Sequence, residues 1–186
     1  MDYEEQYEGY TIQIENDTLP LSPREWDTLT TIYTEAKLPS EIDEVPDNPK
    51  ICKPLYAYEH GGITISTSPF SCRWDSGQIG WVIITEEDQN RIGTPDDRLE
   101  EMLEAEIDTY DSYIRGEVYL YTVESPAGEM VDGCGGFYDK DQAIAEAKGM
   151  IEHFARQARE QKHNKLKALI DNDVPLNKRQ KELEAV

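Results

Sequence analysis

The sequence predicts an α+β fold with a mostly antiparallel sheet of about five to six strands, helices packed on one face, and a long C-terminal helix. Two observations predict it. Short apolar segments follow one another at hairpin-length connections, which antiparallel strands require. Segments with helical spacing of apolar residues lie between these strands and after them.

The N-terminal part begins with an acidic stretch, residues 1–8, which predicts a disordered terminus. Residues 10–14 alternate in polarity and predict a short strand. In residues 22–25, a serine, a proline at the next position and a glutamate at the third form a capping box, which predicts that a helix follows. Its expected inner face comprises Trp26, Leu29, Tyr33 and Ala36.

The centre of the chain predicts three strands. Residues 39–53 are rich in proline and carboxylates and predict a loop. Residues 55–59 and 63–67 predict a hairpin closed by a Gly-Gly turn. After a loop that carries two aromatic residues, residues 79–84 are apolar enough for a central strand.

Two helices are expected next. Thr85 and the acids after it start a short helix that Gly93 ends. The Thr94-Pro95 pair opens a second helix, which runs to about Arg115. Its apolar face comprises Leu99, Met102, Leu103, Ile107, Tyr110 and Ile114.

Residues 117–123 and 129–137 predict two further strands, and Asp139 is expected to cap the long C-terminal helix. The inner face of this helix comprises Ile144, Ala147, Ile151, Phe154 and Ala158. Residues 9–170 are thus predicted to form one domain, followed by a flexible tail, residues 171–186.

The charge of the chain is large and uneven. The net charge is −21, but residues 1–149 hold 10 basic and 33 acidic residues, whereas residues 150–186 hold 8 basic and 6 acidic ones. A body of charge −23 repels nucleic acid and attracts basic proteins, so no direct nucleic-acid partner is expected.

The three cysteines, Cys52, Cys72 and Cys134, form an odd and sparse set that predicts reduced thiols rather than a disulfide framework. Neither a signal peptide nor an apolar run of membrane-spanning length is expected, which predicts a cytoplasmic protein without a membrane partner. The chain lacks calcium-loop, zinc and phosphate-loop patterns, so neither a metal nor another cofactor is expected.

Carboxylates recur along the second expected helix at spacings of 4, 3, 4 and 3, which places them in one stripe that Glu100 broadens. Like charges in this arrangement lower helix stability, so the stripe is a candidate partner-binding surface that imitates the phosphates of DNA. The alternative is a solvated helix face in an acidic protein. The candidate residues are Asp97, Glu100, Glu101, Glu104, Asp108 and Asp111.

A second candidate is a ligand pocket. His60 and Cys72 are the best candidates for a base and a nucleophile, with Asp75 to orient the base, and Trp74 and Cys134 complete the set. No local signature supports catalysis, so no catalytic residue is assigned. The alternative is a turn histidine, a buried cysteine and a loop that Trp74 pins to the core.

The C-terminal segment carries Arg156, Arg159, Lys162, Lys165 and Lys167. These basic residues could complement the helix dipole, contact nucleic acid, or pair with the acidic body of a second copy. The third alternative leaves a homodimer open.

Three stretches, Pro54 to Ser66, Phe70-Ser71-Cys72 and Trp74 to Gly80, carry a specific sequence pattern (PLYxYxHxGIxIS…FSCxWDSGQxG). This pattern resembles a family of small uncharacterised proteins of bacteriophages and other mobile elements. The resemblance covers most of residues 22–139 and implies an accessory protein that acts on host enzymes or host defence, without implying an activity.

These observations favour a non-enzymatic accessory protein that binds and inhibits a host defence protein of the restriction or CRISPR type. The target would hold nucleic acid in a basic groove, and the acidic stripe would occupy that groove as a DNA mimic. One alternative is a small-ligand or nucleotide-binding protein, or an enzyme, that uses the region from His60 to Trp74. The other is an acidic protein adapted to high salt.

Overall fold

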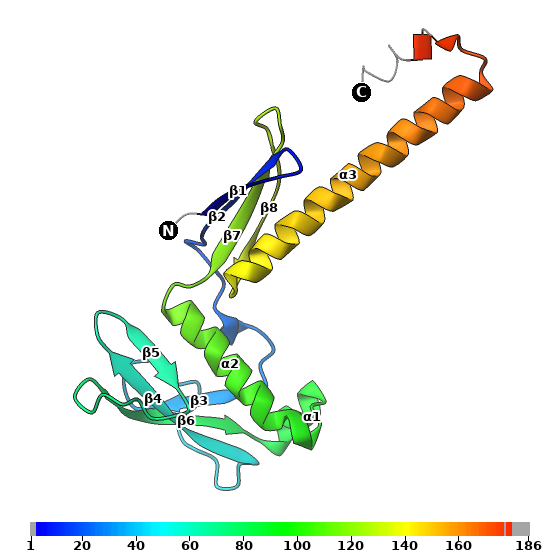
Figure 1. Ribbon diagram of the computed structural model, residues 1–186. Helices are drawn as coiled ribbons and strands as arrows, with labels where there is room; N and C mark the ends of the chain where they lie inside the picture. Colours follow the sequence, from blue (N-terminus) through cyan, green and yellow to red (C-terminus); the bar gives the residue numbers. More distant parts are fainter. Residues whose placement is uncertain (1–2, 177, 180–186) are drawn as a thin grey trace. The chain divides into compact units, whose positions relative to one another are not determined.

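The computed structural model describes residues 3–176, 178 and 179. The chain divides into two compact units, each with one sheet (Figure 1). The first unit comprises residues 1–15, 120–134 and 140–186, and the second comprises residues 16–119 and 135–139. The α+β class, the antiparallel sheets and the long C-terminal helix are as predicted. Where the sequence predicted one sheet in one domain, the strands instead form two separate sheets of four.

The first unit contains a sheet with the strand order β1-β2-β7-β8. These strands are β1 (Tyr3–Tyr7), β2 (Tyr10–Asn16), β7 (Tyr119–Glu124) and β8 (Met130–Phe137). The long helix α3 (Lys140–Asp171) belongs to the same unit. Its buried residues, Ala143, Ala147 and Ile151, recur at helical spacing and supply the apolar stripe that covers a sheet.

The expectation of a disordered N-terminus is wrong for residues 3–7, which form β1 and pair with β2 in antiparallel register. The acidic strand is stabilised by α3, because Lys148 contacts Glu5 at 2.8 Å and lies over the ring of Tyr7. Tyr7 also donates a hydrogen bond to Glu152 at 2.9 Å. Residues 1 and 2 lie outside the described part of the chain, as do 177 and 180–186 of the predicted flexible tail.

The second unit contains the sheet β3-β6-β4-β5, in which β3 and β4 each pair with β6, and β5 pairs with β4, all in antiparallel orientation. Its strands are β3 (Thr31–Thr34), β4 (Ile51–Glu59), β5 (Ile63–Ser66) and β6 (Ser76–Ile84). Two helices, α1 (Glu86–Ile92) and α2 (Leu99–Ile114), and two 3₁₀ turns, η1 (Pro23–Glu25) and η2 (Asp96–Arg98), complete it.

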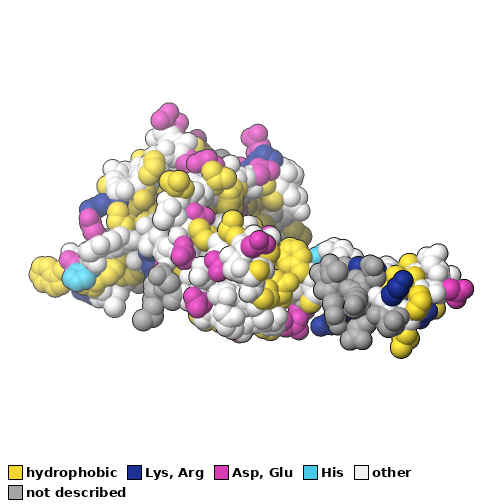
Figure 2. Space-filling view, turned by 90° about the horizontal axis from the view of Figure 1, so that it is seen from above, with side chains coloured by type: hydrophobic (Ala, Val, Ile, Leu, Met, Phe, Trp, Pro, Cys, Tyr) yellow, Lys and Arg dark blue, Asp and Glu magenta, His cyan; other side chains and the backbone are white. Residues whose placement is uncertain are grey.

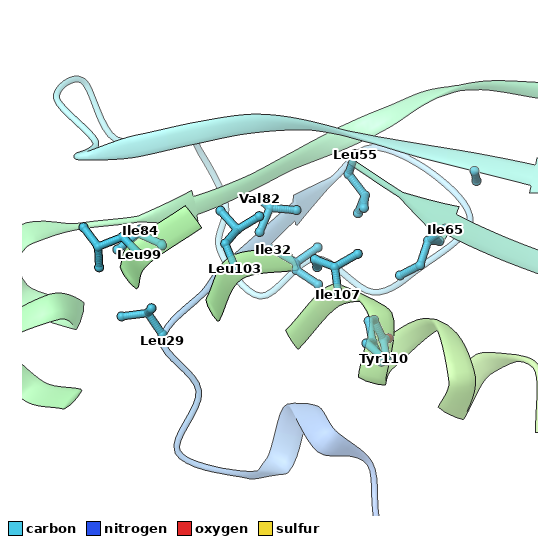
Figure 3. Packing of buried hydrophobic residues seen from close by; sticks show 11 residues of the cluster. Leu29, Ile32, Leu55, Ile65, Val82, Ile84, Leu99, Leu103, Ile107 and Tyr110 are labelled. Atoms are coloured by element: carbon cyan, nitrogen blue, oxygen red, sulfur yellow. The ribbon is translucent and has the colours of Figure 1, made fainter. Parts of the chain in front are cut away.

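Helix α2 packs on this sheet through its predicted apolar face (Figure 3). Leu99, Leu103, Ile107 and Tyr110 are buried at spacings of 4, 4 and 3 along α2. They pack against side chains that the sheet and the segment before it contribute, namely Leu29, Ile32, Leu55, Ala57, Ile65, Val82 and Ile84. Because this face is buried, every other side chain of α2 lies on a flank or toward solvent.

The helix predicted after residue 22 does not form. Ser22 caps only the 3₁₀ turn η1, through a hydrogen bond from the Arg24 N–H at 3.2 Å, and Trp26 is already extended. The segment from Thr30 to Thr34 is β-branched and aromatic throughout, which favours a strand over a helix. Its burial alternates, with Ile32 and Thr34 buried, so tertiary pairing with β6 outweighs the local cap.

The pairing of β4 with β6 contains a β-bulge. Leu55 lies opposite Gly80 and Tyr56 opposite Gln78, so Ile79 is the extra residue. A Cβ on Gly80 would lie 1.9 Å from the Tyr33 carbonyl oxygen, so only glycine allows β3 and β6 to approach this closely.

In the described part of α3, residues 156–164 are all exposed, and the helix runs past its own sheet (Figure 1). Ala158, predicted to lie on the inner face, is therefore exposed, and Phe154 is half-buried. Among the described residues, no helix combines the length and the apolar character needed to cross a bilayer.

Candidate functional site

The six carboxylates predicted as a partner-binding stripe lie on η2 and α2, and two of them, Glu104 and Asp111, reach residues of β4 and β5. They do not form a uniform surface, because two of them hold the unit together and two others pair with nearby cations. On the face drawn in Figure 2, acidic side chains are spread among uncharged ones rather than gathered into one patch.

Glu104 connects α2 to the sheet. Its carboxylate accepts hydrogen bonds from the Lys53 ammonium at 3.0 Å and from the Thr67 hydroxyl at 2.5 Å. Partial burial opposes ionisation, but the two hydrogen bonds outweigh it and lower the pKa of Glu104 below its ordinary value. The hydrogen bond to Glu104 also raises the pKa of Lys53. Glu104 is therefore a structural residue of this unit.

Asp111 also connects α2 to the sheet, at the outer strand β5. Its Oδ1 accepts the backbone N–H of Ile65 in β5 at 2.7 Å, and its Oδ2 lies 3.4 Å from Arg115. Because β5 is the outer strand of its sheet, some of its backbone groups have no strand partner. Asp111 accepts a hydrogen bond from one of these groups, so its carboxylate is largely unavailable to a partner protein.

The remaining four carboxylates, Asp97, Glu100, Glu101 and Asp108, are exposed. Glu101 forms an ion pair with Arg98 at 2.7 Å, and Glu100 lies 3.4 Å from Lys53. Both pairs are solvent-exposed on the acidic side, so each contributes little to stability and can be exchanged for a partner's cation.

Asp108 has no cation within ion-pair distance among the described residues. Partial burial and the carboxylates of Glu104 and Asp111 raise its pKa above the ordinary value. A positive group brought to this position would relieve the repulsion, so a basic partner would favour the ionised form of Asp108.

The predicted ligand pocket is assembled in part. In the turn after β4 and the loop before β6, the Cys72 Sγ donates to Asp75 Oδ2 at 3.6 Å, and His60 Nδ1 lies 3.9 Å from the same oxygen. Asp75 thus stands between the thiol and the imidazole. A thiol nucleophile needs its base at the sulfur, and this position is taken by a carboxylate.

The other two members behave differently. The Trp74 side chain is 96% exposed, so the expectation that it pins the loop to the core is wrong. Tyr58 instead packs against this loop, with its ring centroid 5.7 Å from that of Phe70. Cys134 lies on β8, in the other unit.

Sequence reasoning missed a polar network at the start of β3. Glu106 on α2 accepts the backbone N–H groups of Leu29 at 2.6 Å and Thr30 at 2.9 Å. The Arg24 guanidinium, whose side chain is 9% exposed, donates to both carboxylate oxygens of Glu41 at 2.6 and 2.8 Å. No local signal marks these residues, because the partners are far apart in the chain.

A cavity of about 210 Å³ lies beside this network, between the η1 turn and the flank of α2 opposite to Glu104. Its apolar walls come from Pro23, Trp26, Met102, Ala105 and the methyl-bearing Thr109. The polar residues Arg24, Asp27, Thr28 and Glu106 also line it, but their polar groups are already engaged: Arg24 and Glu106 with Thr30, Asp27 with Arg91, and the Thr28 hydroxyl with the Thr30 carbonyl. The cavity therefore offers apolar contact rather than a polar or charged ligand site.

Among the described residues, no group of three or more His, Cys, Asp or Glu side chains could hold a metal ion. No protein-family model, curated protein sequence or solved structure matches the chain. The resemblance to proteins of phages and mobile elements stays a prediction.

Proposed function

We propose that this protein is a non-enzymatic accessory protein of the kind carried by phages and mobile elements, which binds and inhibits a nucleic-acid-binding defence protein of its host. The contact lies on the solvent-facing side of α2, and the target presents a basic groove that normally holds phosphates. The protein imitates those phosphates with carboxylates.

The presentation of three exposed carboxylates, Glu100, Glu101 and Asp108, on a helix whose opposite face is buried supports this proposal, and Asp97 adds a fourth on the preceding turn η2. Glu101 and Asp108 are seven residues apart on α2, which is two turns to a good approximation, so they lie on one side of the helix. Because α2 is anchored through Leu103 and Ile107, the carboxylates are held in place before binding, which lowers the entropic cost of association.

The net charge of −21 also supports this proposal, because it increases the rate of encounter with a basic protein and disfavours contact with nucleic acid itself. Cations associated with the carboxylates are released on binding and add to the affinity, as cations condensed on DNA are released when such a groove neutralises its phosphates. The expected complex is therefore sensitive to salt.

The test is a triple charge reversal, Asp97→Lys, Glu101→Lys and Asp108→Lys, which spares the structural residues Glu104 and Asp111. Tagged wild-type and variant proteins are used to retain partners from a bacterial lysate at low and at molar salt, and the retained proteins are then assayed for nucleic-acid binding. We expect the wild type to retain a basic nucleic-acid enzyme at low salt and to inhibit it, and the variant to do neither.

The matched control reverses Asp43, Glu44 and Asp47 to lysine. These residues are exposed in the loop before β4 and change the net charge by the same amount at another surface. If both triple variants lose the partner equally, total charge rather than the α2 surface is responsible. Retention and inhibition unchanged in the α2 variant would exclude the mimicry mechanism.

A ligand site around Asp75 is the second candidate, because three predicted residues, His60, Cys72 and Asp75, do come together there. A small-ligand function at this position predicts that His60→Ala and Cys72→Ala abolish activity while the α2 charge reversal leaves it intact. The salt-adaptation alternative predicts neither effect, but a fold whose stability rises steadily toward molar salt.

A further inference from the structure

The cavity beside η1 is built to receive an apolar side chain. Its polar lining groups are engaged inside the unit, since Arg24 donates to Thr30 and Glu41, and Glu106 accepts from the segment before β3. Trp26, which forms one wall, is half exposed, and its ring lies edge-on to that of Tyr138 at 5.6 Å. Contact with an apolar group would remove this exposed surface from water.

Carboxylates surround the cavity on both of its walls. On the η1 side, Glu25 and Asp27 flank Trp26 and are exposed, and Asp27 already forms an exposed ion pair with Arg91, which a partner's cation can replace. On the α2 side, Glu101 and Asp108 stand four residues before and three residues after Ala105, so they share its solvent-facing sector. An occupant must therefore combine an apolar side chain with basic neighbours.

The distal half of α3 has this chemistry. Between residues 156 and 167 it holds five basic residues and one acidic residue. Arg159 lies 4.0 Å from Glu8 in an exposed pair, which a partner's carboxylate can replace. Leu166 and Ile170 remain 36% and 47% exposed, since the helix has run past its sheet. At 100° per residue, Arg159, Lys162, Leu166 and Ile170 lie within a sector of about 80°, so cations and apolar side chains share one face.

We infer that the distal face of α3 in one copy of this protein binds the acid-rimmed cavity between η1 and α2 of a second copy. Leu166 and Ile170 enter the cavity or lie across its mouth, against Trp26 and Ala105. The basic residues one and two turns earlier, Lys162 and Arg159, meet the carboxylates at the rim. This contact is independent of the proposed function, although both use Glu101 and Asp108.

The two surfaces are different, so the contact is heterologous rather than self-complementary. Each copy carries one α3 face and one cavity, and a closed dimer or ring uses all of them. Because each copy is strongly anionic, the distant charges repel, and the attraction at the contact dominates only when the Debye length is short, about 8 Å at physiological ionic strength. Self-association should therefore be measured at that ionic strength.

Sedimentation equilibrium of the full chain over a range of concentrations tests the inference. We expect the wild type to self-associate, and both Leu166→Glu with Ile170→Glu and the single change Ala105→Arg to weaken association by at least about tenfold, which corresponds to about 1.4 kcal/mol. The changed side chains are exposed and Arg and Glu favour helices, so the fold is expected to persist, as circular dichroism would check.

Each variant has a matched control. Gln157→Glu with Gln161→Glu adds the same charge to the opposite face of α3, and Ala145→Arg places the same residue at another exposed helical position. Both controls are expected to associate like the wild type.

Mixing decides whether the two surfaces meet. The α3 variant keeps an intact cavity and the Ala105→Arg variant keeps an intact α3, so an equimolar mixture should form a 1:1 heterodimer although each alone is monomeric. A monomeric wild type at the highest concentration, or association that the variants do not weaken, would overturn the inference. A mixture that remains monomeric would show that α3 and the cavity are not partners.

Discussion

One carboxylate oxygen of Glu106, on α2, accepts two hydrogen bonds from Thr30, the residue before β3: one from its N–H at 2.9 Å and one from its hydroxyl at 2.6 Å. Thr30 is buried, so neither group can turn to water for a replacement. This pair attaches the strand β3 to the helix that covers its sheet.

The change Glu106→Ala should lower the free energy of unfolding by about 3 kcal/mol, because it leaves buried N–H groups of Leu29 and Thr30 without acceptors. Urea denaturation monitored by circular dichroism measures the change. Glu100→Ala, on the same helix with a side chain that is 73% exposed, should cost less than about 0.5 kcal/mol. An equal loss of unfolding free energy in the two variants would show that the hydrogen bonds of Glu106 do not stabilise the fold.

Two carboxylates one turn apart on α2 should respond to neutralisation in opposite directions. Because the pKa of Asp108 is raised, its ionised form is disfavoured in the folded protein, and Asp108→Asn should increase stability at pH 7 by a few tenths of a kcal/mol. The gain should vanish at a pH below the ordinary pKa of Asp, where the wild-type carboxyl is protonated in both states.

The pKa of Glu104 is lowered, so its ionised form stabilises the fold at any pH above the ordinary pKa of Glu, and this contribution disappears as the pH falls through the lowered value. Glu104→Gln should therefore reduce stability at pH 7, by about 0.5–1 kcal/mol after allowance for the exposed part of the side chain. Thermal unfolding of both variants at pH 7 and pH 3 provides the measurement. Shifts of the same sign at pH 7 would contradict both assignments.

Gly80→Ala should destabilise the second unit by more than about 3 kcal/mol, because the new Cβ would lie 1.9 Å from the Tyr33 carbonyl oxygen and 2.9 Å from Thr34 Cα. Backbone atoms of β3 cannot move aside without losing their pairing with β6. Gly77→Ala in the same strand meets nothing within 4 Å and should change stability by less than about 1 kcal/mol. Similar denaturation midpoints for the two variants would disprove the close approach of these strands.

Trp74→Ala should leave the free energy of unfolding unchanged within about 0.5 kcal/mol, since the side chain is 96% exposed. Trp81→Ala, in β6 opposite Tyr33 and Pro54, should cost more because part of its ring is buried. Collisional quenching of fluorescence supplies a second measurement, in which removal of Trp74 should abolish the most accessible component. A large loss of stability on removal of Trp74 would restore the interpretation that it pins its loop.

The elements that sequence analysis predicted correctly are those whose signals are local. The short helix α1 begins after Thr85 and ends at Gly93, as expected; in the structure Thr85 and Asp88 form a capping box, and Gly93 is in the left-handed conformation. The apolar face of α2 was also readable from spacing alone. The helix predicted after Ser22 failed because its cap is local, whereas the pairing that makes Thr31–Thr34 a strand depends on β6, about 50 residues later.

The candidate site was predictable only as a set of residues on one helix. Which carboxylates are structural depends on partners far along the chain: Lys53 lies 51 residues from Glu104, and Ile65 lies 46 residues from Asp111. The cavity beside Trp26 was not predictable, since it requires η1 to lie against α2. Spacing on a helix gives the direction of a side chain but not the element that it meets.

The position of β3 in its sheet has a consequence for the protein during its synthesis. This strand leaves the ribosome well before β6, its pairing partner, and before Glu106, which accepts the N–H of Thr30, the residue that precedes the strand. Until then a β-prone, uncharged run of five residues from Thr30 to Thr34 stays unpaired in the nascent chain, where such runs promote aggregation. Asp27 and Glu35 stand on either side of it, so the acidity of the chain also acts as a gatekeeper against premature association.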